Sequence, residues 1–456
     1  MVAIVKMAYE DILKEIQRVP KPSHYRYELK LYPDGGDKVA AMQIIHMDFT
    51  RNFEVTYADQ IMVSAIFQQK DISKVIYPNR NKLMAELTRI PIGEISEEVD
   101  PNRKIVVRNY RVALVDARED SLRGQANFDD GQGMREITMQ FYDPVIEWLR
   151  LQTFGTSFYK EPVGRIIQWH LCYHSKLVKA SDEHAVKGVE IWPVDRADTD
   201  DITIVPHGTS LLDLPAYLQQ HCNGVYNHGI GYYLHSPWTP YGDRKIKGRV
   251  WYVYPLYDGT RYEKSKYRLD VIVIPPNQIQ GQDRSWYLKD STMYISTTGQ
   301  VVHVDEKDID FANQGNGVRF AKATDSFNKW APASKNIAKA DPSQTTAQFF
   351  AQERENKKQA APFGKRRFTD NIPFELSELT AREVQYIKLV WNNASSEFLI
   401  PGMPTRIIYF SKRGKEELYG TLLAIEENVS HDNPSMTSRR MRTNCGLTFA
   451  VAPRKQ

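Results

Sequence analysis

Cysteine is scarce in this chain of 456 residues, and its three thiols, Cys172, Cys222 and Cys445, lie far apart. Their odd number and the lack of a CxxC pair argue against a disulfide framework and favour maturation in reducing cytosol. Long apolar runs are missing too, since none exceeds five residues, which predicts no membrane-spanning helix. The apolar start, Met1 to Val5, is too short for the core of a signal peptide. Export by the usual secretory route is therefore not expected.

A strong net charge is also absent. Lys and Arg total 60 and Asp and Glu total 56, which leaves a formal charge of +4 at pH 7. This balance gives no electrostatic footprint for a dedicated nucleic-acid-binding protein. The short basic runs at 365–367 and 439–442 could touch phosphates, but solvated faces or contacts to an acidic partner explain them better. We expect no membrane association and no specific nucleic-acid binding.

Catalytic signatures are missing as well. The sequence has no GxSxG, HExxH or Walker motif, and Gly131-Gln132-Gly133 lacks the third glycine and the strand–turn–helix frame of a phosphate-binding loop. A pair of carboxylates for sugar cleavage leaves no sequence signature, because its geometry is tertiary. The sequence therefore predicts a protein that is not an enzyme, with no catalytic residue and no cofactor.

Aromatic residues, in contrast, are abundant. They form 11% of the chain, with 25 Tyr and 8 Trp, and they suit both half-buried strands and protein interfaces. The composition leaves these two interpretations open. The length is typical of about three domains. The order of strand, helix and loop patterns predicts a β-rich α+β chain with two antiparallel β units, each a sheet, sandwich or barrel, a mixed α/β middle region and a long connector.

The first barrel is predicted within residues 23–118, after an amphipathic helix in residues 1–22 that ends at Pro20 and Pro22. From Tyr25 to Leu31 apolar and charged residues alternate, and a Pro-Asp-Gly-Gly turn follows. Further strands are expected at 43–48, 51–57, 62–67, 82–90 and 104–116, with a short helical piece near 71–75. Strands at this spacing favour a barrel or sandwich of about 100 residues.

A mixed α+β region is predicted over residues 119–321. Helices are expected near 145–151 and 209–222, and strands at 165–173, 229–235, 249–256, 267–274 and 286–295. On a strand, His170, Cys172 and His174 would share one face. Residues four apart on a strand lie ~13 Å apart, whereas zinc–ligand bonds are about 2.0–2.3 Å long, so one ion could not reach all three. No metal site is predicted.

Residues 322–370 have a different character, with Ala, Lys, Gln, Asn and Pro in place of apolar strands. This pattern predicts an extended connector with one helix near 345–358. Such a length without strands is unusual inside a compact domain. We expect the connector to be disordered or wrapped over a partner surface. If the chain is part of a larger assembly, wrapping over a partner is the favoured alternative.

Residues 371–456 carry the second predicted barrel. Short apolar strands are expected at 398–400, 403–410, 418–425 and 442–451, with a tight turn at Pro401-Gly402. A helix is expected before them, with Thr380 as its N-cap and Val384, Ile387, Val390 and Trp391 on one face.

The order of helix, LIPGMPTRIIYF, LYGTLLAIEENVSHD and TNCGLTFAVAP resembles the C-terminal barrel of baseplate or tail hub proteins of contractile-tailed phages and related injection machines. The barrel-like residues 23–118 and part of 205–300 extend the resemblance. It implies two tail-tube-like barrels in each chain and a homotrimer that adapts the sixfold tail tube to a threefold spike. The implied partners are the tail tube protein, a separate spike protein, the tape-measure protein and baseplate wedge proteins. The implied location is the tail baseplate of a virion assembled in the host cytoplasm.

Two alternatives remain open from the sequence. The many Tyr and Trp residues would also suit a tail-tip hydrolase or carbohydrate-binding protein. A tube, terminator or neck protein of the same particle would share the barrel fold.

Overall fold

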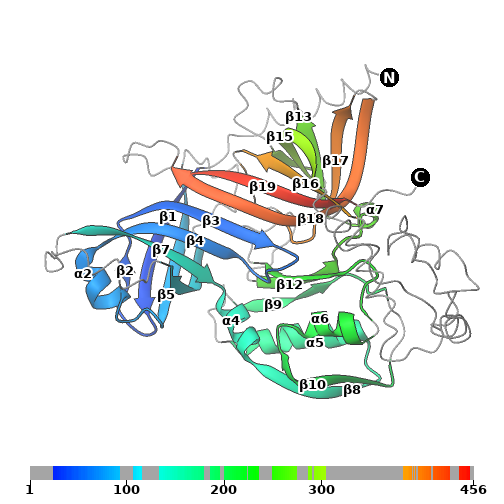
Figure 1. Ribbon diagram of the computed structural model, residues 1–456, viewed down its shortest axis with the longest axis horizontal. Helices are drawn as coiled ribbons and strands as arrows, with labels where there is room; N and C mark the ends of the chain where they lie inside the picture. The colour runs from blue at the N-terminus through cyan, green and yellow to red at the C-terminus, as the bar shows by residue number, and fades with distance from the viewer. Residues whose placement is uncertain are drawn as a thin grey trace, which may run out of the picture.

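We analysed a computed structural model of the chain (Figure 1). It describes residues 24–92, 106–115, 133–178, 185–195, 200–235 except 223, 249–274 except 266, 286–289, 292–304, 384–392, 394, 396, 399–411, 414–431 and 441–451. The predicted helix in residues 1–22, the Gly131-Gln132-Gly133 loop up to residue 132, the connector 322–370 and the Thr380 cap lie outside these residues. Within the described part, no helix is long and apolar enough to cross a membrane.

Eight strands close into a first ring, on the left of Figure 1. Its order is β18-β3-β4-β7-β6-β5-β1-β19, and the β18–β19 pair closes it, with every neighbouring pair antiparallel. Their bounds are β1 (His24–Pro33), β3 (Gln43–Asn52), β4 (Gln60–Gln68), β5 (Leu83–Ile92), β6 (Val106–Leu114), β7 (Met134–Tyr142), β18 (Gly414–His431) and β19 (Met441–Val451). The short β2 (Val39–Ala40) pairs with β1.

Side chains fill the interior of the first ring. Alternate residues of its strands point inward and include Leu29, Leu31, Met47, Phe67 and Phe141, each at most 2% exposed. A ring of eight strands is just wide enough to be filled in this way. Helix α2 (Gln69–Asp71) and the π-helix η1 (Ile72–Ile76) follow β4, where a short helical piece was predicted, and Ile72 and Ile76 join the core.

A second ring of six strands lies beside the first. Its order is β13-β17-β18-β19-β16-β15, and the β13–β15 pair closes it. The new strands are β13 (Arg268–Ile274), β15 (Thr292–Val304), β16 (Gln385–Trp391) and β17 (Pro404–Ser411), and β14 (Trp286–Lys289) pairs with β15 outside the ring. The predicted β-rich α+β class is confirmed. One arrangement differs, because β13 runs parallel to both of its neighbours.

The second ring is not built from residues 371–456 alone, since β13 and β15 come from the stretch assigned to the middle region. Sequence separation hides this pairing, because strand partners are chosen by packing in three dimensions. The two rings share the long β18–β19 hairpin (Figure 1). The first half of β18 pairs with residues 404–411 of β17, and the second half of β18 pairs with β3. A register shift between Leu422 and Ala424 marks the passage from one ring to the other.

A layered α/β domain, lowest in Figure 1, completes the described structure. Strands β11 (Ile230–His235), β12 (Arg249–Pro255) and β9 (Val186–Ile191) form one sheet, and β8 (Thr153–Tyr159) with β10 (Ile202–Ser210) forms a two-stranded ribbon. Helices α4 (Pro144–Leu151), α5 (Val163–Lys176) and α6 (Leu214–His221) lie between the sheet and the ribbon and contribute to a core of their own. The short α7 (Arg261–Lys264) leads toward β13.

Two predicted elements are wrong. The helix expected over residues 380–391 is strand β16 where the structure describes it, because Ile387, Leu389 and Trp391 are buried at alternate positions while Val390 is 50% exposed. The strand expected at 165–173 is helix α5. Its apolar residues Val163, Ile166, Ile167 and Leu171 also lie on one face of a helix. This helical spacing, and not the short apolar–polar alternation, describes the observed structure.

Two boundaries also shift. The strands expected at 43–48 and 51–57 form one strand, β3, which ends at Asn52. The helix expected from Thr209 begins at Leu214, because Thr209 and Ser210 complete β10 and Pro215 favours the first turn of a helix.

The tight turn at Pro401-Gly402 is confirmed. Gly402 has a φ of 64°, and the Met403 N–H donates to the Ile400 carbonyl at 3.1 Å. A Cβ at this position would lie 2.0 Å from the ring of Tyr254, which belongs to β12 of the layered domain. Glycine is therefore required here for its backbone conformation and also for the close approach of the two parts.

We predict that Gly402→Ala destabilises the protein more than Gly35→Ala does. Gly35 also has a positive φ, 77°, but no atom lies within 4 Å of the place that a Cβ would occupy, so alanine there meets only backbone strain of about 1–2 kcal/mol. At Gly402 the collision with Tyr254 adds roughly 1–3 kcal/mol. Urea denaturation of the two variants measures the difference. Equal losses of stability would contradict the collision.

Candidate functional site

The connection between β3 and β4, residues 53–59, is the point where all three parts of the molecule meet; we call it the junction loop. Phe53 packs in the core of the second ring and forms an edge contact with Tyr233 of β11, with ring centroids 4.8 Å apart. Its N–H donates to the carbonyl of Leu423 at the register shift of β18, at 2.8 Å. Ala58 belongs to the core of the layered domain, and the Tyr57 carbonyl accepts from the N–H of Leu234 at 2.7 Å.

Local hydrogen bonds fix the shape of the junction loop. The Asn52 side chain accepts from the Glu54 N–H at 3.0 Å, and the Asn52 carbonyl accepts from the N–H and the hydroxyl of Thr56, both at 2.8 Å. Asn and Thr form such side-chain turns readily. They explain why β3 stops at Asn52. At the far side, the Glu54 carboxylate accepts from the hydroxyls of Tyr257 and Tyr386, at 2.6 and 3.2 Å.

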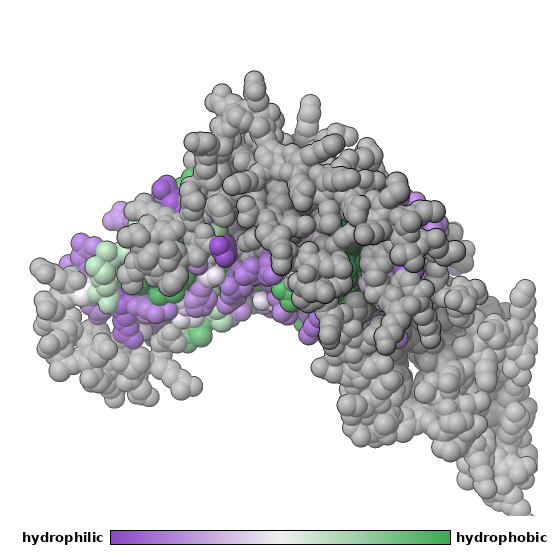
Figure 2. All heavy atoms as spheres, turned by 90° about the horizontal axis from the view of Figure 1, so that it is seen from above, coloured by the Kyte–Doolittle hydropathy of each residue, from purple (hydrophilic) through white to green (hydrophobic). Residues whose placement is uncertain are grey.

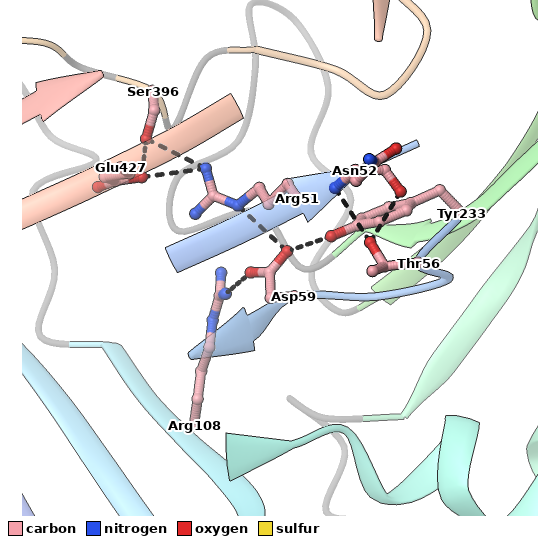
Figure 3. Close-up of polar contacts among 8 residues, drawn as sticks. All are labelled: Arg51, Asn52, Thr56, Asp59, Arg108, Tyr233, Ser396 and Glu427. Atoms are coloured by element: carbon pink, nitrogen blue, oxygen red, sulfur yellow. Dashed lines mark hydrogen bonds and ion pairs between the residues drawn. The ribbon is translucent and has the colours of Figure 1, made fainter. Parts of the chain in front are cut away.

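A buried ionic cluster follows the junction loop (Figure 3). Asp59 accepts from Arg51 Nε at 3.1 Å and from the Tyr233 hydroxyl at 2.8 Å, and Arg108 Nη1 lies 3.5 Å from its second oxygen. Arg51 Nη1 also contacts Glu427 at 3.1 Å and Ser396 at 3.2 Å. The Ser396 hydroxyl donates to Glu427 at 2.5 Å.

The cluster is almost closed to solvent. Its four charged side chains, Arg51, Asp59, Arg108 and Glu427, are between 4% and 8% exposed as residues. They come from β3, the junction loop, β6 and β18, while Tyr233 comes from β11. Two positive charges face two negative charges, so the charges balance. A balanced and hydrogen-bonded cluster is the form in which buried charge is tolerated.

The electrostatics of the cluster favour the ionised groups. Burial alone would raise the pKa of Asp59, but the charges of Arg51 and Arg108 outweigh it and lower the pKa below its ordinary value. Burial would lower the pKa of Arg51, and the carboxylates of Asp59 and Glu427 outweigh it and raise that pKa. Burial and the neighbouring Asp59 raise the pKa of Tyr233 well above its usual value, so its hydroxyl stays a donor.

None of these cluster residues was singled out from the sequence, although a signal was present. In three strands a charged residue occupies an inward position of an alternating pattern. Arg51 follows the buried Met47 and Phe49, and Glu427 lies between the buried Ile425 and Val429. Inward charge on a barrel strand needs a buried partner, but the partner's identity depends on the tertiary structure.

The row of His170, Cys172 and His174 lies on helix α5, so the strand geometry predicted for it is wrong. On the helix His170 and His174 share a face, with ring centroids 4.6 Å apart, and Cys172 points elsewhere. The Nε2–H of buried His170 donates to the Leu211 carbonyl at 2.6 Å. Within the described residues, no group of three or more His, Cys, Asp or Glu side chains is arranged to hold a metal ion.

The chain matches no family model and no curated protein. Several solved structures are similar to it. A tail protein from Neisseria meningitidis has a TM-score of 0.40 and 8% identity, over 93% of this chain and 96% of that one. A type VI secretion system component from Escherichia coli has a TM-score of 0.38 and 8% identity, over 96% and 76%. A prophage 43 kDa tail protein from Shewanella oneidensis has a TM-score of 0.38 and 9% identity, over 93% and 98%. Two of these structures are tail proteins, and the third is a component of a type VI secretion system.

We predict that Asp59→Asn lowers the free energy of unfolding by about 3–5 kcal/mol, because it leaves Arg51 and Arg108 with one buried carboxylate between them. The matched control is Glu28→Gln. Glu28 pairs with Arg26 at 3.0 Å, but both side chains are more than a third exposed, so the loss there is at most about 1 kcal/mol. Urea denaturation of both variants tests this. A loss at Asp59 as small as at Glu28 would show that the cluster does not stabilise the junction.

A second prediction concerns His170 and pH. Burial lowers the pKa of His170 from 6.5 to about 4, so the folded state holds it neutral. The unfolded chain binds the proton more readily. The stability contributed by neutral His170 is thus complete above pH 6.5 and is lost as the pH falls toward 4, by up to about 3 kcal/mol. His170→Gln, whose amide can still donate to Leu211, should flatten the dependence of unfolding free energy on pH in this window. His221→Gln, at an exposed position, is the control. The same slope in His170→Gln and wild type would contradict the assignment.

Proposed function

We propose that this chain is a structural hub subunit of a phage-type tail baseplate, which works as a homotrimer and adapts a sixfold tail tube to a threefold spike. The observation that carries the proposal is the presence of two closed rings of strands in one chain, joined through the shared β18–β19 hairpin. Three copies would then present six rings. Closed point-group symmetry is the usual form of such assemblies.

The junction supports the same proposal, because a symmetry adaptor must hold its two rings in a fixed relative orientation. The junction loop contributes to the cores of the second ring and of the layered domain, and the ionic cluster connects β3 and β6 of the first ring with β18 and β11. Packed cores and fully partnered buried charges resist continuous deformation. The two rings would thus move as one body under load.

The proposed partners follow from this arrangement. The six rings of a trimer would contact the tail tube protein on one face, and a separate spike protein would bind the opposite face. The tape-measure protein would pass through the lumen, and baseplate wedge proteins would surround the hub. The location would be the tail baseplate of a virion assembled in the host cytoplasm. On this proposal the chain has no catalytic role.

The test is the oligomeric state and shape of the purified full chain. Mass photometry should give the mass of three chains of 52.7 kDa each, and electron-microscopic class averages should show a threefold particle with a central channel bordered by six ring-like densities. A monomer at micromolar concentration, or a sixfold ring of six chains, would overturn the proposal. The sixfold ring would favour a tube or terminator protein instead.

A further inference from the structure

A small cavity lies where the layered domain meets the turn before β17. Its volume is about 100 Å³ and it is partly open to solvent. It is bordered by the end of β9, by β12 and α7, and by residues 400–404, with Trp192, Tyr254, Arg261 and Gly402 among its walls. A cavity of this size accommodates several water molecules or a small polar group.

Arg261 is a buried cation in the wall of this cavity. It is 3% exposed, and its guanidinium donates to the carbonyl of Gly402 at 2.9 Å, to the hydroxyl of Thr421 at 3.1 Å and to the carbonyl of Asp258 at 3.3 Å. All three acceptors are neutral. Among the described residues no ion pair joins a carboxylate to Arg261. Burial lowers the pKa of Arg261 to about 10, because the charge of nearby Asp258 offsets burial only in part.

Three other arginines of the described residues form ion pairs instead. Arg51 contacts Asp59 and Glu427, Arg249 contacts Asp143, and the partly buried Arg406 contacts Asp270 through two nitrogens, at 3.1 and 2.6 Å. Burying a charge without a counter-charge is costly. Arg261 therefore differs from them in having neutral partners and an open space beside it instead of a carboxylate.

The aromatic walls of the cavity provide a second, independent observation. The guanidinium carbon of Arg261 lies 5.6 Å from the ring centre of Trp192 and 5.5 Å from that of Tyr254, so the rings stabilise the charge only in part. The Tyr254 hydroxyl is buried and has no hydrogen-bond partner. Burial raises the pKa of this hydroxyl, so it remains a donor at neutral pH. A buried donor without an acceptor costs about 1–3 kcal/mol.

We propose that this cavity binds a carboxylate group, with Arg261 supplying the counter-charge and the Tyr254 hydroxyl a further donor. A carboxylate fits better than a phosphate, because it carries a single negative charge, which one cation balances. Its two oxygens can accept from the two donors, the guanidinium and the hydroxyl. Glu190 also lines the cavity, but it is exposed, and water screens its charge far more than that of buried Arg261. The carboxylate would come either from a small free acid or from an acidic side chain of a neighbouring protein.

The experiment measures binding of sodium acetate to the full chain at pH 7, by saturation transfer from the protein to the acetate methyl protons, at constant ionic strength set with sodium chloride. We expect saturable binding in the wild type. Arg261→Gln should weaken it at least tenfold, as expected for a charge-assisted hydrogen bond, and Tyr254→Phe roughly fivefold. Arg165→Gln removes the same charge at a side chain that is 75% exposed on α5, and should leave binding unchanged.

The two cavity variants are expected to differ in their effect on stability, so a loss of binding can be told apart from a loss of folding. Arg261→Gln loses hydrogen bonds to Gly402 and Thr421 and can reduce stability, which a thermal melt reveals. Tyr254→Phe removes a hydroxyl that has no partner, so it should fold at least as stably as the wild type and yet bind acetate more weakly. No saturable binding in the wild type, or unchanged binding in Tyr254→Phe, would overturn the proposal.

The source of the carboxylate is distinguished by a second probe, N-acetylaspartate amide, which carries the same group on a peptide-like frame. Tighter binding of this probe than of acetate indicates an acidic side chain from a protein partner. Equal or weaker binding indicates a small free acid. The test is independent of the proposed function, because it measures a site within one chain and does not depend on oligomeric state.

Discussion

The ion pair between Arg51 and Asp59 is the interaction on which the architecture depends. Both groups are almost closed to solvent, so each must be neutralised within the protein. Their remaining partners come from other parts of the chain: Glu427 and Ser396 for Arg51, Arg108 and Tyr233 for Asp59. An assembly in which the rings or the layered domain were displaced would leave buried charge without a partner. The need to pair every buried charge thus specifies one arrangement of the three parts, whereas burial of apolar side chains alone would be compatible with several arrangements.

The shared β18–β19 hairpin gives this junction its mechanical form. One pair of strands belongs to two rings, so the rings cannot separate without breaking the ladder that closes both. The register shift at Leu423 turns the hairpin from one ring into the other, and the carbonyl of Leu423 is satisfied by Phe53 of the junction loop. Seen from above, hydrophilic side chains predominate on the visible described surface, with small hydrophobic patches between them (Figure 2).

The contrast between the ionic cluster and Arg261 separates two uses of buried charge. In the cluster, two arginines and two carboxylates neutralise each other, which suits a fixed structural joint. At Arg261 the partners are two carbonyls, a hydroxyl and two aromatic rings beside an open cavity. The first arrangement is complete within the chain, and the second has room for a negative group from outside it.

The sequence by itself determined the β-rich class, the strands with clear alternation such as β1 and β4, and the turn at Gly402, because strand period and glycine conformation are local properties. It failed at α5 and β16, where the apolar residues fit both a helical and a strand period and only the neighbours could decide. The cluster shows the same limit: alternation places Arg51 and Glu427 inward, but not beside each other. Only the tertiary structure decided that β13 and β15 close the second ring, and that one hairpin serves both rings, because strand pairing between distant segments is set by packing and buried charge rather than by local pattern.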